Sequence, residues 1–241
     1  MGKKEAHCDP DDPLERLQGD HWNHTAVDAE SRLLLSIVPG KRTAENCEKL
    51  VEDAKMRTGG RTDILITSDE HAPYAAAIEK AYSVEVPEPD PLRPGQTPAP
   101  KRRMPDDLCY ATVRKTREKG RVVEVVTGIV FGTAVLLSWL LSRSRASRRL
   151  NTSFVERNNG TQRRQNSRKV RKTYAFSKDW DVHNAASYFL GFSYNFCWPV
   201  RTLRELGRDG RWQPRTPAMA AGLADHVWTI EEWATYPARP P

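Results

Sequence analysis

The sequence lacks the short motifs by which several enzyme classes are recognised. It contains no GxxxxGK phosphate loop, no GxSxG nucleophile elbow and no HExxH zinc helix, and it has no internal repeat. Each motif positions a particular group: backbone amides around phosphates, an exposed serine, or two histidines on one helix face. The sequence therefore gives no support to a P-loop nucleotide hydrolase, an α/β-hydrolase or a zincin protease.

Cysteine is also scarce, and no two cysteines form a CxxC pair. Zinc sites need tight pairs at fixed spacing, and in the stretch from His7 to His24 only His21 and His24 come close to this. We interpret that acidic stretch as a solvated loop. With no secretory signal ahead of them, the cysteines are expected to be reduced thiols in a cytoplasmic protein. They are Cys8, Cys47, Cys109 and Cys197.

Acidic residues are almost absent between residues 143 and 178. This segment contains twelve Lys or Arg residues and a single acid, Glu156, in a chain of net charge +7. Such a patch attracts phosphate backbones or anionic lipid, because each neutralised phosphate releases condensed counterions. The alternative is a merely solvated charged face.

Charge is missing altogether from residues 125–141, VVTGIVFGTAVLLSWLL. A single helix of this length would span about 26 Å, slightly less than a bilayer core. Its first half is β-branched and interrupted by Gly128 and Gly132, whereas its second half is rich in helix formers. We therefore expect a strand followed by a helix, with a transmembrane helix as the alternative.

Alternating strand and helix signals predict an α/β protein. Residues 24–40 read as a hairpin, 42–60 as a helix, 62–70 as a buried strand, and Ala72 to about Tyr82 as a helix. Residues 110–132 predict a hairpin that turns at Lys119–Gly120, followed by helices from about 133 and over 180–198. Residues 87–107 hold seven of the seventeen prolines and predict an insertion without regular structure. The expected segments are 1–86, the insertion 87–107, 108–206 and an irregular tail 207–241 with a short helix.

Two carboxylates stand where they could bind a metal ion. Asp69 follows the strand predicted in ILITSDE, a position where α/β folds expose functional groups. Together with Glu156 it could hold Mg²⁺ or Mn²⁺, which prefer oxygen ligands and promote in-line phosphoryl transfer. Salt bridging and strand-end capping are the alternatives. In a helix at about 100° per residue, Glu156 shares one face with Arg163, Ser167 and Arg171, and Arg164 lies nearby, although the turn signal NNG at 158–160 opposes such a helix.

The chain resembles the DDE-class transposases of the insertion-sequence-one type. The resemblance rests on GKKE at 2–5, AVDAESRLLLSIVPGKRT at 26–43, ITSDEHAPY at 66–74, NTSFVERNNGTQRRQNSRKVRKTYAFSKDWDVH at 151–183, YNFCWPVRTLR at 194–204 and RTPAMAAGLADHVW at 215–228. It implies an RNase H-like mixed sheet flanked by helices. Asp69 and Glu156 match the second and third catalytic acids of the family.

The first acid of the family's triad has no match in this sequence. In the family it precedes Gly-Lys-Lys within Asp-Glu-x-Trp-Ser-Phe-Val, whereas here Met1 directly precedes Gly2. Asp28 lies in the hairpin turn that follows the family's catalytic strand, so it is not expected to be a substitute. We therefore expect either a truncated, catalytically impaired copy or a start that lies further upstream.

The resemblance implies metal-dependent cleavage of DNA at the ends of an element and strand transfer to target DNA, by a homo-oligomer assembled on DNA. Two alternatives are a non-catalytic DNA-binding remnant and a single-pass membrane protein. Contacts to DNA phosphates, without reading of sequence, are expected from the basic run. Its candidate residues are Arg163, Arg164, Arg168, Lys169, Arg171 and Lys172.

Overall fold

The chain folds into two compact units. The computed structural model describes residues 5–9, 11–13, 15, 19–86, 101–170, 174–175 and 177–237. Unit 1 combines residues 1–42 with 153–241, and unit 2 comprises residues 43–152. These boundaries differ from the expected segment ends at 86, 107 and 206. Each unit contains both helices and strands, so the α/β class is confirmed.

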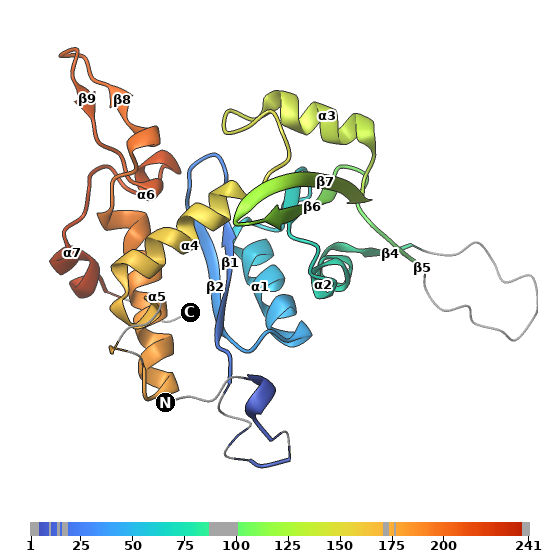
Figure 1. The fold of residues 1–241 in the computed structure, drawn as a ribbon. Coiled ribbons are helices and arrows are strands. Elements are labelled where there is room, and N and C mark those ends of the chain that lie inside the picture. Colours follow the sequence, from blue (N-terminus) through green and yellow to red (C-terminus); the bar gives the residue numbers. More distant parts are fainter. Residues whose placement is uncertain are drawn as a thin grey trace, which may run out of the picture. The chain divides into compact units, whose positions relative to one another are not determined.

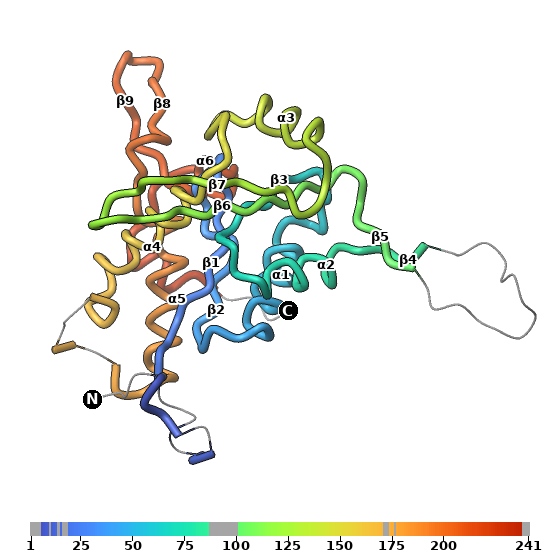
Figure 2. Tube along the Cα trace, turned by 45° about the vertical axis from the view of Figure 1, so that its right-hand side comes forward, coloured from blue at the N-terminus to red at the C-terminus, as the bar shows by residue number. Residues whose placement is uncertain are grey.

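Unit 2 is built on a three-stranded mixed sheet (Figures 1 and 2). β3 pairs in parallel with β6, and β6 pairs antiparallel with β7. The predicted turn between β6 and β7 is confirmed: Lys119 and Gly120 both have positive φ, 47° and 80°, as the favoured two-residue hairpin turns require. The strands are β3 (Leu65–Ser68), β6 (Cys109–Glu118) and β7 (Arg121–Phe131).

The helices of unit 2 lie where the sequence predicts them, and each end that the sequence predicts is matched within three residues. Thr43 caps α1 (Ala44–Arg57) by accepting a hydrogen bond from the Asn46 amide at 3.3 Å, and α2 (Pro73–Tyr82) begins with proline. Both helices lie on one side of the sheet, and α3 (Ala134–Arg143) lies on the other (Figures 1 and 2). The core of this unit consists of Cys47, Val51, Ala77, Ile78, Tyr82, Leu108 and Tyr110.

The uncharged segment 125–141 is a strand followed by a helix, as predicted. β7 ends at Phe131, and Thr133 caps α3 by accepting from the Leu136 amide at 3.1 Å. No helix among the described residues is both long enough and apolar enough to span a bilayer. The transmembrane alternative for this segment is therefore not supported.

The prediction that residues 87–107 lack regular structure is wrong at one place. Lys101–Arg103 form β5, which pairs antiparallel with β4 (Val84–Val86). Its partner strand β4 lies just before the insertion. The composition of the insertion alone could therefore not indicate this pairing. Residues 87–100 lie outside the described residues.

Unit 1 contains the predicted N-terminal hairpin, formed by β1 (Trp22–Val27) and β2 (Leu34–Gly40). The Asp28 carboxylate closes its loop by accepting hydrogen bonds from the amides of Glu30 and Ser31, at 3.2 and 2.9 Å, and from the Ser31 hydroxyl. The Asp28 amide donates to the Leu33 carbonyl at 2.8 Å. Asp28 is thus a turn residue, in agreement with the interpretation of the sequence.

Helices α4 (Ser153–Gln165) and α5 (Trp180–Cys197) pack against this hairpin (Figure 1). The Asn195 side chain fixes α5 to β2, because it accepts from the Leu34 amide at 2.8 Å and donates to the Leu34 carbonyl at 2.9 Å. Leu34, Ile37 and Tyr194 form the small apolar core of this unit. A Cβ at Gly191 would meet Leu34 and Ile37 at 3.3 Å, so a larger residue there would require these side chains to shift slightly.

The C-terminal tail has more structure than the single short helix expected. Its aromatic residues pack on α5, where Phe196 stacks on Trp233 with ring centroids 5.4 Å apart. Figure 2 shows the narrow β8–β9 ribbon. The remaining elements are η1 (Glu5–His7), η3 (Ser167–Lys169), η4 (Arg201–Leu203), β8 (Glu205–Leu206), β9 (Trp212–Gln213), α6 (Pro217–Ala220) and α7 (Ile230–Thr235).

Candidate nucleic-acid interface

Asp69 lies directly after β3 in unit 2 and is exposed. The Ser68 hydroxyl donates to the Asp69 carbonyl at 2.6 Å and lies 2.8 Å from the Tyr110 hydroxyl. Burial raises the pKa of Tyr110, and the negative charge of Asp69 adds to this effect. The carboxylate thus occupies the carboxyl end of a strand in a parallel pair, as expected.

Glu156 is exposed in the first turn of α4, which continues through the turn signal at 158–160. Polar contacts explain why this stretch remains helical. Asn158 is buried and accepts from Gln162 Nε2 at 2.7 Å, while Thr25 Oγ1 of β1 donates to Asn159 Oδ1 at 3.1 Å. The side chains of Asn158 and Asn159 therefore make hydrogen bonds that hold the helix in place, and the two residues do not form a turn.

The two sides of α4 differ sharply in exposure. Asn158 and Gln162 are buried, and Glu156, Arg163 and Arg164 are all exposed.

The expected helical face is wrong in one respect, since Ser167 does not belong to α4. The helix ends at Gln165, and the Asn166 side chain caps η3 by accepting from the Arg168 amide at 3.0 Å. Arg171 and Lys172 lie outside the described residues.

The expected metal ligands belong to different units, Asp69 to unit 2 and Glu156 to unit 1. Within the part of the chain that the structure describes, no three His, Cys, Asp or Glu side chains are grouped so that they could hold a metal ion. The described residues therefore supply no complete ligand set of this kind. In the stretch considered for zinc, His24 Nε2 lies 3.3 Å from the Lys41 carbonyl oxygen.

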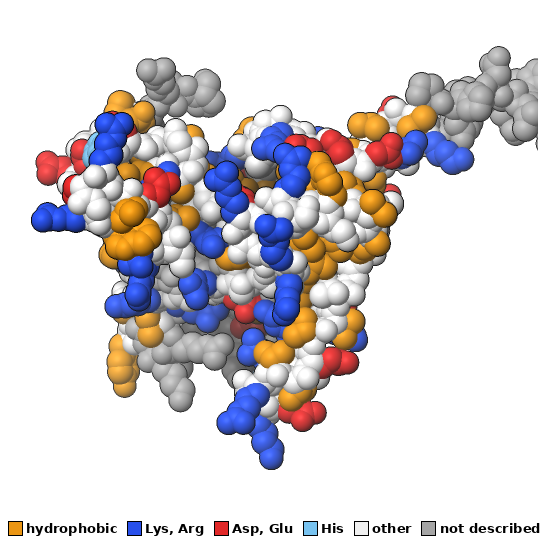
Figure 3. Space-filling view, turned by 90° about the horizontal axis from the view of Figure 1, so that it is seen from above, with side chains coloured by type: hydrophobic (Ala, Val, Ile, Leu, Met, Phe, Trp, Pro, Cys, Tyr) orange, Lys and Arg blue, Asp and Glu red, His pale blue; other side chains and the backbone are white. Residues whose placement is uncertain are grey.

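Three arginines of the basic run are exposed at the C-terminal end of α4 and in η3: Arg163, Arg164 and Arg168. No Asp or Glu occurs between residues 157 and 178. Lys and Arg side chains are prominent on the face of the molecule seen in Figure 3. We refer to Arg163, Arg164 and Arg168 as the arginine face of unit 1.

Lys169 follows the arginine face but turns inward. Its Nζ donates to Gln162 Oε1 at 3.3 Å and, with the Asn23 amide oriented to donate to the Trp22 carbonyl, also to the oxygen of Asn23. Burial lowers the pKa of Lys169 to about 8. Near neutral pH this ammonium group is therefore close to its titration point.

Two histidines lie beside Lys169, and nothing in the sequence pattern indicates that they meet. His21 stacks on Trp180 with ring centroids 4.1 Å apart and touches His183 edge-on at 4.8 Å. His183 Nδ1 lies 2.8 Å from Ser177 Oγ. Burial lowers the pKa of His183 to about 4, with the charges of His21, Lys169 and Arg168 adding to the effect, and burial also lowers the pKa of His21. Both imidazoles are therefore neutral at physiological pH.

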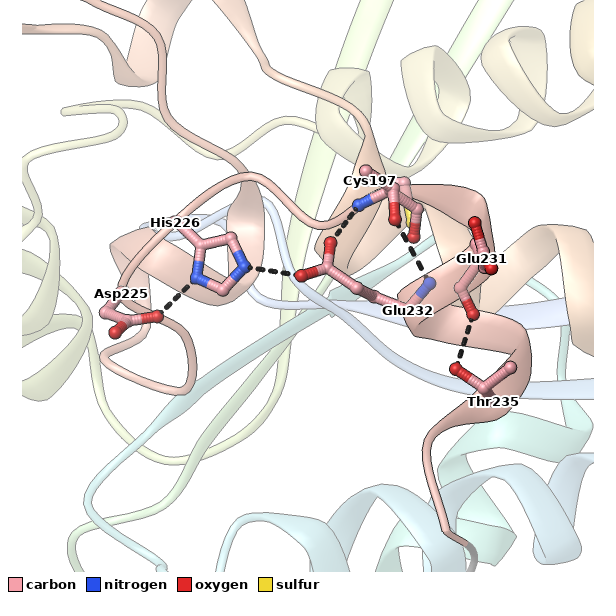
Figure 4. Close-up of polar contacts among 7 residues, drawn as sticks. Cys197, Asp225, His226, Glu231, Glu232 and Thr235 are labelled. Atoms are coloured by element: carbon pink, nitrogen blue, oxygen red, sulfur yellow. Dashed lines mark hydrogen bonds and ion pairs between the residues drawn. The ribbon is translucent and has the colours of Figure 1, made fainter.

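An acid–histidine arrangement lies in the tail, where His226 bridges Asp225 at 2.6 Å and Glu232 at 3.2 Å (Figure 4). The Glu232 carboxylate also accepts from the Thr229 amide at 2.6 Å, which completes a capping box at the start of α7. Burial raises the pKa of the nearby Cys197 thiol, which points to the Thr229 carbonyl at 3.6 Å. The thiol is thus not activated as a nucleophile, and the arrangement stabilises α7.

No family model, no curated protein and no solved structure matches this chain. The feature with the clearest chemical meaning is the arginine face, with Lys169 beside it.

Proposed function

We propose that unit 1 binds the sugar–phosphate backbone of DNA through its arginine face. The observation that carries this proposal is the exposure of Arg163, Arg164 and Arg168 over one helix end and the following turn. Arginine presents a planar fork of donors that matches phosphate oxygens, and the absence of acids from 157 to 178 leaves this charge uncompensated in the local sequence. Phosphate contacts of this kind position DNA without reading its sequence.

The resemblance of the sequence to insertion-sequence-one transposases supports a more specific form of this proposal, namely that the protein is a transposase. In that interpretation the α/β units belong to an RNase H-like fold, and the DNA is an element end or a target, bound by a homo-oligomer. Asp69 and Glu156 would bind Mg²⁺ or Mn²⁺, which supplies charge stabilisation during phosphodiester cleavage. A non-catalytic DNA-binding protein is the second candidate, because backbone binding by the arginine face does not require the two acids.

Fluorescence anisotropy with two duplexes of unrelated sequence tests the binding proposal. We expect similar affinities for both duplexes and a steep loss of affinity with added salt, because bound arginines displace condensed counterions. Absence of binding at low salt, or binding that salt does not weaken, would contradict DNA-backbone binding.

The same preparation distinguishes the two candidates when Mg²⁺ or Mn²⁺ is added. Nicking of the duplex that depends on the metal and disappears in Asp69→Asn and Glu156→Gln would support the transposase. Binding without nicking, unchanged in both variants, would support the non-catalytic protein. Both substitutions retain the size of the side chain and remove only its charge, so unfolding is not expected to obscure the result.

A further inference from the structure

Unit 1 contains a hollow of about 130 Å³ whose lining is rich in hydrogen-bond donors. A water molecule occupies about 30 Å³ in the liquid, so the hollow has room for a tetrahedral oxyanion. None of the described residues that line it is acidic. Its polar lining consists of Arg32 from the hairpin loop, Ser153, Arg157 and Asn158 from α4, Tyr194 from α5, and Thr202 from η4.

Arg32 brings a cationic group with an unused donor to this hollow. Its guanidinium lies 4.1 Å from the centre of the Phe154 ring, and its Nη1 atom is buried and makes no hydrogen bond with the described residues. Burial lowers the pKa of Arg32, and the charges of Glu30 and Asp28 partly oppose this effect, but neither acid lines the hollow. A buried guanidinium edge without a partner is costly, and an oxyanion would satisfy it.

Asn158 provides a second donor at the lining. It is 3% exposed, and its Oδ1 is held by the hydrogen bond from Gln162 Nε2 at 2.7 Å. Its Nδ2 is buried and lies beside the Tyr194 hydroxyl, whose pKa this contact lowers, but no described residue accepts from it within ordinary hydrogen-bond geometry. The bond from Gln162 fixes which end of the amide is the donor, so an NH₂ group is available at the lining.

Tyr194 adds a neutral hydroxyl. Burial raises the pKa of its phenol, and Asn158, Arg32 and Arg157 only partly oppose this effect. The hydroxyl therefore stays protonated at neutral pH and can donate. The lining thus combines guanidinium, amide and hydroxyl donors, which together match the oxygens of a phosphate.

We propose that this hollow binds a phosphate group, either free phosphate or the terminal phosphate of a DNA strand. The site is separate from the arginine face, because Asn158 lies on the buried side of α4 whereas Arg163 and Arg164 are exposed. The proposal goes beyond backbone binding and does not depend on it, so either can fail alone. The Arg32 guanidinium would donate hydrogen bonds to the phosphate oxygens, and hydrogen bonds from Asn158 and Tyr194 would fix the orientation of the phosphate.

Thermal unfolding and ³¹P NMR with inorganic phosphate test the site. A ligand that binds only the folded protein raises the melting temperature with its concentration. We expect this rise in the wild type. In Asn158→Asp the phosphate affinity should be weaker by about ten-fold or more, because a negatively charged oxygen replaces the N–H donor. Asp retains an acceptor for Gln162 Nε2, so folding should persist. Asn159→Asp introduces the same charge on α4 outside the lining and keeps the acceptor for Thr25 Oγ1, so this control should bind phosphate as the wild type does.

Arg32→Gln should also abolish the response, and if this variant does not fold, Tyr194→Phe replaces it with an expected partial loss. Absence of a phosphate response in the wild type, or equal affinity in Asn158→Asp and the control, would overturn the proposal. Oligonucleotides with and without a 5′-phosphate identify the source. An effect of Asn158→Asp confined to the phosphorylated strand assigns the site to a DNA end, whereas an effect on inorganic phosphate alone assigns it to free phosphate.

Discussion

Replacing Arg163, Arg164 and Arg168 together with glutamine is expected to weaken duplex DNA binding by at least about ten-fold at moderate salt. Each phosphate contact adds about 0.9 to the slope of log affinity against log salt, so the loss of three contacts should reduce this slope by up to about 2.7. The side chains are exposed, and glutamine is a good helix former, so the fold should be unaffected. Anisotropy titrations across a salt series measure both quantities.

The matched control removes the same charge from an exposed strand of unit 2. Lys101, Arg102 and Arg103 form β5 in unit 2, and all three are exposed. Their replacement with glutamine should change the slope much less than the loss of the arginine face. An equal effect in both triple variants would mean that only net charge matters, and it would contradict a localised interface.

DNA binding is expected to be coupled to the uptake of a proton by Lys169. Its pKa is about 8 in the free protein, and a nearby phosphate favours the charged form, so the pKa rises on binding. DNA therefore selects the protonated lysine, and affinity should fall by up to about ten-fold between about pH 7 and about pH 9. Calorimetry in two buffers of different ionisation enthalpy measures the proton uptake directly.

The groups around Lys169 do not titrate in this range. Burial lowers the pKa values of His21 and His183, so both are already neutral at pH 7. Lys169→Arg keeps the charge at every pH used and should remove the pH dependence. A wild-type affinity that stays constant over this range, without proton uptake, would show that no phosphate reaches Lys169.

The sequence predicts the individual helices and strands of this fold better than it predicts which of them pair or pack together. The hairpin turn at Lys119–Gly120 and the start of α2 at Pro73 depend on local backbone preferences, which the residues themselves carry. The pairing of β4 with β5 joins strands on either side of the insertion, so no local pattern contains it. The division into units joins residues 1–42 to residues 153–241, two segments that the whole of unit 2 separates in the sequence.

The sequence likewise predicts only part of the candidate binding sites. Charge density alone identifies the arginine face, because a run of basic residues without acids is visible in the sequence. The hollow is not visible in this way, since its donors Arg32, Asn158 and Tyr194 come from three distant segments. Asn158 even gives a misleading signal, because its turn propensity is overridden by the bond from Gln162.

Hydrogen–deuterium exchange of the full chain with and without duplex DNA tests backbone binding by the arginine face most directly. Bound DNA should slow amide exchange in α4 and η3, from Ser153 to Lys169, by suppressing local opening, and should leave exchange in the β6–β7 hairpin unchanged. Protection confined to other segments, with none in α4 or η3, would contradict the account.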